Sequence, residues 1–182
     1  MGMESYFIVL LPEKVRPAKK NKYNAFEGCS DMLISDFIRQ LKDVELEINI
    51  LFKDSVLCEL AVDNMLKMSC GIEQNYLREI IIEGCFASFQ ENIQFCFHTA
   101  SIIHNKIISV SFYHPAIGYS LGFESQDEFI DLFMNIYINK IENFRKTFGD
   151  VKFKSLPGTS FYNALRKHNR KKVFLSLFKR NI

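Results

Sequence analysis

The chain has 182 residues, of which 48% are hydrophobic and 24% charged, a composition that excludes a disordered chain and suffices for a core without disulfides. Its five cysteines are an odd number without a CxxC pair, which excludes a disulfide framework and favours free thiols in a reducing cytosol. No segment approaches the ~20 apolar residues of a membrane-spanning helix, and the start of the chain lacks a signal-peptide pattern, so we expect a cytoplasmic protein.

The net charge of +2 hides an uneven distribution. From Val151 onward there are nine Lys or Arg residues and no Asp or Glu, whereas residues 26–150 carry a net charge of −10. A second basic stretch, residues 12–26, precedes this acidic middle. Such asymmetry can steer a charged partner. Alternatively, the basic and acidic charges compensate each other within the chain if the last segment packs beside the middle. We favour the internal explanation.

The first third of the chain predicts a strand, a basic loop and a helix. The apolar run Tyr6–Leu11 predicts a buried strand that ends at Pro12, and residues 12–26 follow as a loop. Ser30 is placed to cap a helix over residues 31–42. The apolar residues of that helix recur at helical spacing and form one stripe: Leu33, Ile34, Phe37, Ile38 and Leu41.

The clearest strand pattern covers residues 44–52, where apolar residues alternate with Glu45, Glu47 and Asn49. Residues 55–62 predict its hairpin partner. Residues 64–90 fit two interpretations, because they can form a helix that Gly84 terminates or can be partly strand. Both alternatives stay open at this point.

The second half predicts another hairpin and a long helix. Residues 92–115 read as two strands that turn near Asn105, and residues 118–123 as a loop with two glycines. Ser125 and Glu128 spell a capping box before an amphipathic helix over residues 126–148, which Gly149 ends. Residues 150–182, the basic C-terminal segment, predict a short strand, a short helix, a basic turn and a last strand.

These elements predict a single α+β domain over residues 1–182. Five or more short strands would form a mixed or antiparallel sheet, and the long amphipathic helix would pack on one face of it.

One candidate site for chemistry lies in the predicted second hairpin. With a turn at Asn105, Cys96 would oppose His114, and His98 would share their face, so the three could bind zinc or form a thiolate–imidazole pair. The same face carries a run of apolar residues, so we interpret it as core and predict neither a metal nor another cofactor. Ser120 lies in a GxSxG pattern, but Pro115 interrupts the lead-in and only one histidine follows, so we interpret it as a turn.

Without a convincing catalytic motif, we expect a non-catalytic protein that binds a protein partner. The acidic strand residues Glu45, Glu47 and Glu59 are the expected contacts for a basic partner, such as a toxin neutralised by an immunity or antitoxin protein. The alternative is nucleic-acid binding through the basic loop 12–26 and the C-terminal segment. Its contact residues would be the cations of the predicted last turn: Arg166, Lys167, Arg170, Lys171 and Lys172.

Overall fold

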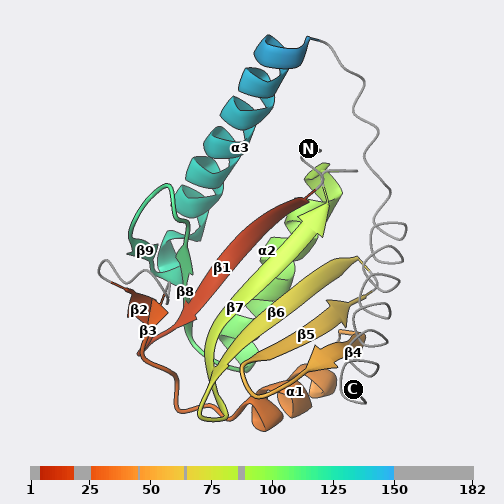
Figure 1. The fold of residues 1–182 in the computed structure, drawn as a ribbon, viewed down its shortest axis with the longest axis vertical. Coiled ribbons are helices and arrows are strands. Elements are labelled where there is room, and N and C mark those ends of the chain that lie inside the picture. The colour runs from red at the N-terminus through yellow and green to blue at the C-terminus, as the bar shows by residue number, and fades with distance from the viewer. Residues whose placement is uncertain (1–4, 19–25, 45, 64, 86–88, 150–182) are drawn as a thin grey trace, which may run out of the picture.

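A computed structural model describes residues 5–18, 26–44, 46–63, 65–85 and 89–149. Within these ranges a seven-stranded antiparallel sheet has the order β4-β5-β6-β7-β1-β8-β9, and three helices accompany it (Figure 1). The strands are β1 (Ser5–Pro12), β4 (Ile48–Lys53), β5 (Leu57–Val62), β6 (Leu66–Glu73), β7 (Tyr76–Cys85), β8 (Val110–Tyr113) and β9 (Ser120–Leu121). The helices are α1 (Ile34–Asp43), α2 (Phe89–Lys106) and α3 (Gln126–Phe148). This architecture confirms the predicted α+β class.

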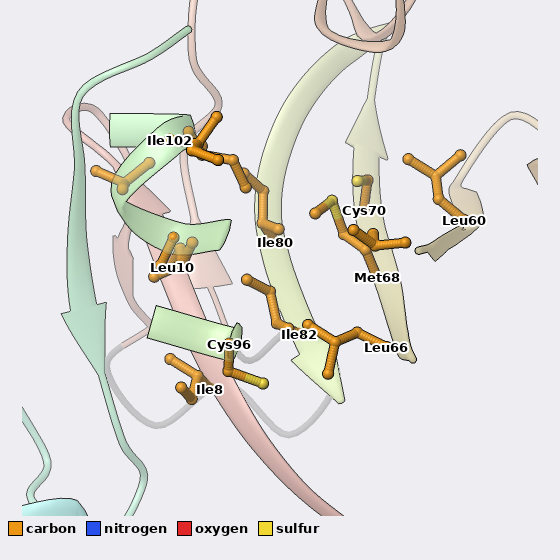
Figure 2. Close-up of a cluster of buried hydrophobic side chains, with 14 of the residues drawn as sticks. Ile8, Leu10, Leu60, Leu66, Met68, Cys70, Ile80, Ile82, Cys96 and Ile102 are labelled. Carbon is orange, nitrogen blue, oxygen red and sulfur yellow. The ribbon is translucent and has the colours of Figure 1, made fainter. Parts of the chain in front are cut away.

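The helices share one core with one face of the sheet. Alternate residues of the strands point into this core, among them Ile8 and Leu10 of β1 and Ile80 and Ile82 of β7 (Figure 2). Cys96 of α2 lies against them, and α2 runs behind β7 in Figure 1. Buried side chains of all three helices join this cluster: Ile34, Phe37, Ile38, Leu41, Ile93, Phe97, Ala100, Ile103, Phe129, Phe133 and Tyr137.

The opposite face is covered in part by a short ribbon. Strands β2 (Arg16–Pro17) and β3 (Phe26–Glu27) pair with each other, and Phe26 packs edge-on against Tyr113 of β8 with ring centroids 5.5 Å apart. A second, smaller core of Val9, Leu11, Val15 and Phe26 forms beneath the ribbon. The predicted basic loop 12–26 is therefore partly this ribbon, and its residues 19–25 lie outside the described residues.

Residues 64–90, which fitted both a helix and a strand interpretation, contain a hairpin. β6 and β7 pair antiparallel, and the two residues between Glu73 and Tyr76 have positive φ, 51° at Gln74 and 72° at Asn75. Two positive φ values in a two-residue loop match the twist of paired strands. β7 continues through Gly84, so the alternative of a helix ended by that glycine is wrong.

The predicted hairpin over residues 92–115 is wrong. Residues up to Lys106 form α2, and only β8 is a strand, which pairs with β1 rather than with a local partner. The buried positions Ile93, Cys96 and Phe97 and, further along, Ala100 follow helical spacing. A dense apolar run obscured this period, because such a run fits a buried strand as well as a buried helix.

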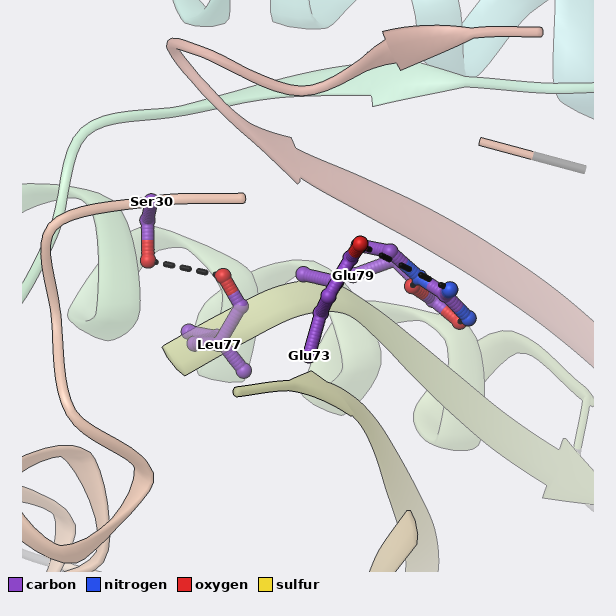
Figure 3. A network of polar contacts seen from close by, with 5 residues as sticks. Ser30, Glu73, Leu77 and Glu79 are labelled. Carbon is purple, nitrogen blue, oxygen red and sulfur yellow. Dashed lines mark hydrogen bonds and ion pairs between the residues drawn. The ribbon is translucent and has the colours of Figure 1, made fainter. Parts of the chain in front are cut away.

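Ser30 does not cap α1. The N-cap of α1 is Leu33, which makes no side-chain cap, whereas the Ser30 hydroxyl donates to the Leu77 carbonyl oxygen at 2.8 Å (Figure 3). It also accepts the Met32 N–H at 3.2 Å. Ser30 therefore ties the lead-in of α1 to β7. The predicted stripe is buried as expected except for Leu33, which is 38% exposed.

The strand predicted over residues 44–52 is shorter and irregular. β4 begins at Ile48 and pairs with β5 as expected, but its register shifts between Ile50 and Phe52. This bulge breaks the alternation and leaves Ile50 49% exposed.

The long helix is present with the predicted bounds. Gly149 ends it with φ 74°, a conformation that costs glycine little. Ser125 is its N-cap residue, but its side chain makes no capping hydrogen bond, so the predicted capping box with Glu128 is wrong. The elements predicted for residues 150–182 lie outside the described residues.

Candidate functional site

The sheet register places a row of carboxylates on the face of the sheet opposite the three helices. On β5, β6 and β7, Leu60, Met68 and Ile82 point into the helix-side core (Figure 2). Their neighbours Glu59, Lys67 and Glu83 therefore project to the opposite side, since successive side chains alternate. We call this side of β4–β7 the acidic face.

One lysine links two of these carboxylates. The Lys67 Nζ atom lies 2.6 Å from Glu59 Oε1 on β5 and 4.0 Å from Glu83 Oε2 on β7. All three side chains are half-buried, and Lys67 lies directly opposite Glu83 in the register. A single ammonium group between two carboxylates leaves this row of three strands with a net negative charge.

A second acidic group lies closer to the β6–β7 turn. Arg78 donates from Nε to Glu79 Oε2 at 2.5 Å and from Nη2 to Glu79 Oε1 at 3.2 Å. Glu73 lies 4.0 Å from the same guanidinium, and Figure 3 shows this group beside Leu77. The hydrogen bond that Arg78 donates to Glu79 raises the pKa of Arg78, so the guanidinium stays protonated.

Gly71 makes room for the Glu79 carboxylate. A Cβ atom at Gly71 would collide with that carboxylate, and Gly71 pairs with Leu57 on the acidic side of β5. Glu79 therefore lies on the acidic side of the sheet in the space that the glycine leaves, where it is buried.

The predicted contact residues fall on this face where they are described. Glu47 is exposed just before β4, and its N–H donates to Asp63 Oδ1 at 2.7 Å at the end of β5. The register Ile48↔Val62 then places Glu47 on the same side as Glu59. Glu45 lies outside the described residues. Glu83 was not among the predicted contacts, because the consecutive apolar residues Ile80, Ile81 and Ile82 before it show no alternation from which its side could be predicted.

The Cys96, His98 and His114 cluster does not form. Cys96 is buried on α2, where its sulfur lies 3.4 Å from the Tyr6 hydroxyl, and His98 is exposed on the same helix. His114 is buried after β8. In the part of the chain that the structure describes, no group of three His, Cys, Asp or Glu side chains is placed to hold a metal ion. The zinc interpretation fails because the hairpin that would have aligned these residues is absent.

Ser120 lies in a two-residue edge strand rather than at a nucleophile elbow. β9 pairs antiparallel with β8, whereas an elbow follows a parallel strand. A shallow cavity of about 360 Å³ lies elsewhere, between α2 and α3, beside His98 and Gln126. Another, of about 570 Å³, has Ser120, Glu13 and Arg16 among its lining residues. The cavity at Ser120 has no histidine among its described lining residues, whereas the cavity between α2 and α3 is lined by both His98 and Ser101.

The basic residues of the alternative site are mostly outside the described ranges. Arg166, Lys167, Arg170, Lys171 and Lys172 all belong to residues 150–182. In the N-terminal basic stretch, Lys14 forms an ion pair with Asp31, and this hydrogen bond raises the pKa of the lysine. The charge of Lys14 is thereby balanced by Asp31 of the same chain.

Comparison of the chain with protein-family models, with curated proteins and with solved structures returned no match. Across the described ranges, none of the helices combines the length and the apolar character that crossing a membrane requires.

Proposed function

We propose that the protein is a non-catalytic binding module whose acidic face recognises a basic surface of a protein partner. The observation that carries this proposal is the asymmetry of the two layers. All three described helices pack on one side of the sheet, and the side they leave carries Glu47, Glu59, Glu79 and Glu83 against Lys67 and Arg78. A face of this charge favours encounter with a positively charged partner.

Apolar groups on the same face supply the second ingredient of a protein interface. Phe7 of β1 is 38% exposed beside Glu83, and Leu57 and Ile81 are half-buried on the acidic side. Protein interfaces combine such an apolar centre with a charged rim. An immunity or antitoxin protein that neutralises a basic toxin is the partner relationship that this surface fits best.

The test is native mass spectrometry of the full chain purified gently from its host at low salt. We expect a protein in fixed stoichiometry with the chain. The variant Glu47→Lys/Glu83→Gln should lower its occupancy at least tenfold, because it removes two negative charges from the acidic face and adds one positive charge. Its matched control is Asp131→Lys/Glu128→Gln, the same charge change on exposed positions of α3, which should leave occupancy unchanged.

The absorbance ratio at 260 and 280 nm, recorded on the same sample, separates the alternative function. Nucleic acid that dissociates as salt rises, without a protein partner, would overturn the proposal in favour of the basic C-terminal segment as the binding surface. Equal loss of the partner in both double variants would also contradict it, since the effect would then follow net charge alone.

A further inference from the structure

The acidic face combines negative charge with apolar side chains, and one segment of the same chain is complementary to both features. Its described carboxylates outnumber its cations, and half-buried or exposed apolar side chains lie between them. A surface that offers both features fits a segment in which basic and apolar residues alternate, rather than a purely cationic loop.

Residues 150–182 have that composition. Nine Lys or Arg residues follow Asp150 without another acidic residue. Apolar residues are interspersed among them, chiefly Val151, Phe153, Leu156, Phe161, Leu165, Val173, Phe174, Leu175, Leu177 and Phe178.

The segment is also long enough to reach the acidic face. It starts after Gly149 at the end of α3, a helix of 23 residues that spans about 35 Å. An extended chain covers roughly 3.3 Å per residue, so the 33 residues from 150 to 182 could span on the order of 100 Å. The segment is therefore long enough to span the length of α3 and still reach across β5, β6 and β7 on the other side of the sheet.

We propose that residues 150–182 dock on the acidic face of their own chain, as an internal ligand that a basic partner must displace. The displacement part rests on the proposed function; the docking itself does not. Tethering favours this occupant over a second copy, because a segment on the same chain has an effective concentration on the order of millimolar. The docked segment thus acts as a competitive inhibitor built into the protein.

Limited trypsin digestion of the full chain measures the docking without any partner. Trypsin cleaves after Lys and Arg, so the segment carries nine potential sites. At low salt we expect cleavage within residues 151–182 to be at least tenfold slower than in a free peptide of the same sequence. Raising the salt to 0.5 M should accelerate cleavage in the full chain several-fold, because it screens the attraction.

Paired variants assign the protection to the acidic face. Glu47→Lys/Glu83→Gln should accelerate cleavage of the segment at least threefold, and the control Asp131→Lys/Glu128→Gln should not change it. Lys171→Glu/Lys172→Glu should accelerate cleavage at the remaining sites in the same way. Cleavage as fast as in the free peptide, or equal rates in the acidic-face variant and its control, would overturn the docking.

Carbodiimide coupling of a one-to-one mixture of ¹⁵N-labelled and unlabelled chains identifies the chain that supplies the segment. We expect bonds between lysines of residues 150–182 and Glu47 or Glu83 within a single isotope. Mixed-isotope products would show that a second copy supplies the segment and would overturn the same-chain assignment.

The two proposals fail separately. Partner binding that depends on the acidic face, with cleavage of the segment unaffected, would reject the internal ligand and keep the proposed function. Protection that depends on the acidic face, with no protein partner in native mass spectrometry, would do the reverse. If both hold, Lys171→Glu/Lys172→Glu should raise affinity for the partner about as much as it accelerates cleavage.

Discussion

His114 is a buried imidazole placed between the sheet and α3. Its Nδ1 atom accepts the Ala116 N–H at 3.1 Å, and its Nε2 atom is buried without a hydrogen-bond partner among the described residues. The ring stacks on Phe7 and meets the edges of Phe133 and Tyr137. Burial first, and then the charge of Lys140, lower the pKa of His114. A proton on Nδ1 would also break the bond from Ala116, which acts in the same direction.

This geometry predicts that the fold loses stability in mild acid. Because the folded-state pKa of His114 lies below its ordinary value near 6.5, the unfolded chain takes up the proton first, and stability falls as pH drops through that value. The free energy of unfolding, measured with urea between pH 7.5 and 5.5, should decrease by at most about 1.4 kcal/mol per pH unit for this one proton. His114→Gln should flatten the dependence, and His98→Gln, on the exposed side of α2, should not. An unchanged slope in His114→Gln would contradict the assignment.

Gly84 shows what a single residue can hide from sequence reasoning. It lies in β7, and a Cβ atom there would come within 2.5 Å of Asn92 Oδ1 and 2.6 Å of the Tyr6 hydroxyl oxygen. The glycine thus permits the buried hydrogen bond in which Tyr6 donates to Asn92 at 3.0 Å, joining β1 to α2. The sequence interpretation took the same glycine for a possible helix terminator, because its neighbours across the fold are 78 positions and 8 positions away and leave no local trace.

At the scale of elements, α3 is attached through its first half. Phe129, Phe133 and Tyr137 are buried, whereas Ile138 is 43% exposed and the positions with described burial beyond it are exposed or half-buried. Phe133 has its ring centroid 6.1 Å from that of Phe97 on α2 and 5.9 Å from that of Tyr6 on β1. It therefore joins three elements at one point.

We expect Phe133→Ala to cost about 3–5 kcal/mol of unfolding free energy, since it leaves a cavity in a packed aromatic cluster. The control Ile138→Ala, five positions along the same helix, should cost less than about 1 kcal/mol. Urea denaturation followed by circular dichroism measures both. Similar losses in the two variants would mean that α3 is not anchored at Phe133.

Elements with a strong local period were the ones that could be predicted. The stripe of α1, the length of α3 and the β4–β5 hairpin follow from patterns within a few residues of each other. α2 was misread although Gln94, His98 and Ser101 recur at helical spacing on its more exposed side, because apolar residues such as Phe95 and Ile102 adjoin the buried ones and favoured a strand interpretation. The contact of Ser30 with Leu77 could not be predicted, since it joins residues 47 positions apart.

At the scale of the whole molecule, a single large core joins every described helix to the sheet. Residues of α1, α2 and α3 belong to the same buried cluster as those of β1 and β5–β8. We therefore expect one cooperative unfolding transition, in which far-UV circular dichroism and tyrosine fluorescence give coincident curves in urea. Separate transitions for the two probes would contradict a common core.

The candidate site also combines features that could be predicted from the sequence with features that could not. Alternation in the sequence identified Glu47 and Glu59 as facing one side, but only the strand order shows that Glu83, 24 positions after Glu59, shares a lysine with it. Which residues lie on a face is a local property of each strand. Which strands are neighbours depends on long-range pairing, which alternation does not encode.

The position of β1 has a consequence for synthesis. β1 pairs on one edge with β7 and on the other with β8, so it is fully paired only after residues up to Tyr113 have been synthesised. At ~5–20 residues per second, a ribosome needs roughly 5–20 s to make the intervening hundred residues. Until β7 (Tyr76–Cys85) has been made, the apolar stretch from Tyr6 to Leu11 has neither partner strand, so a nascent chain of this protein offers a chaperone a binding segment early in translation.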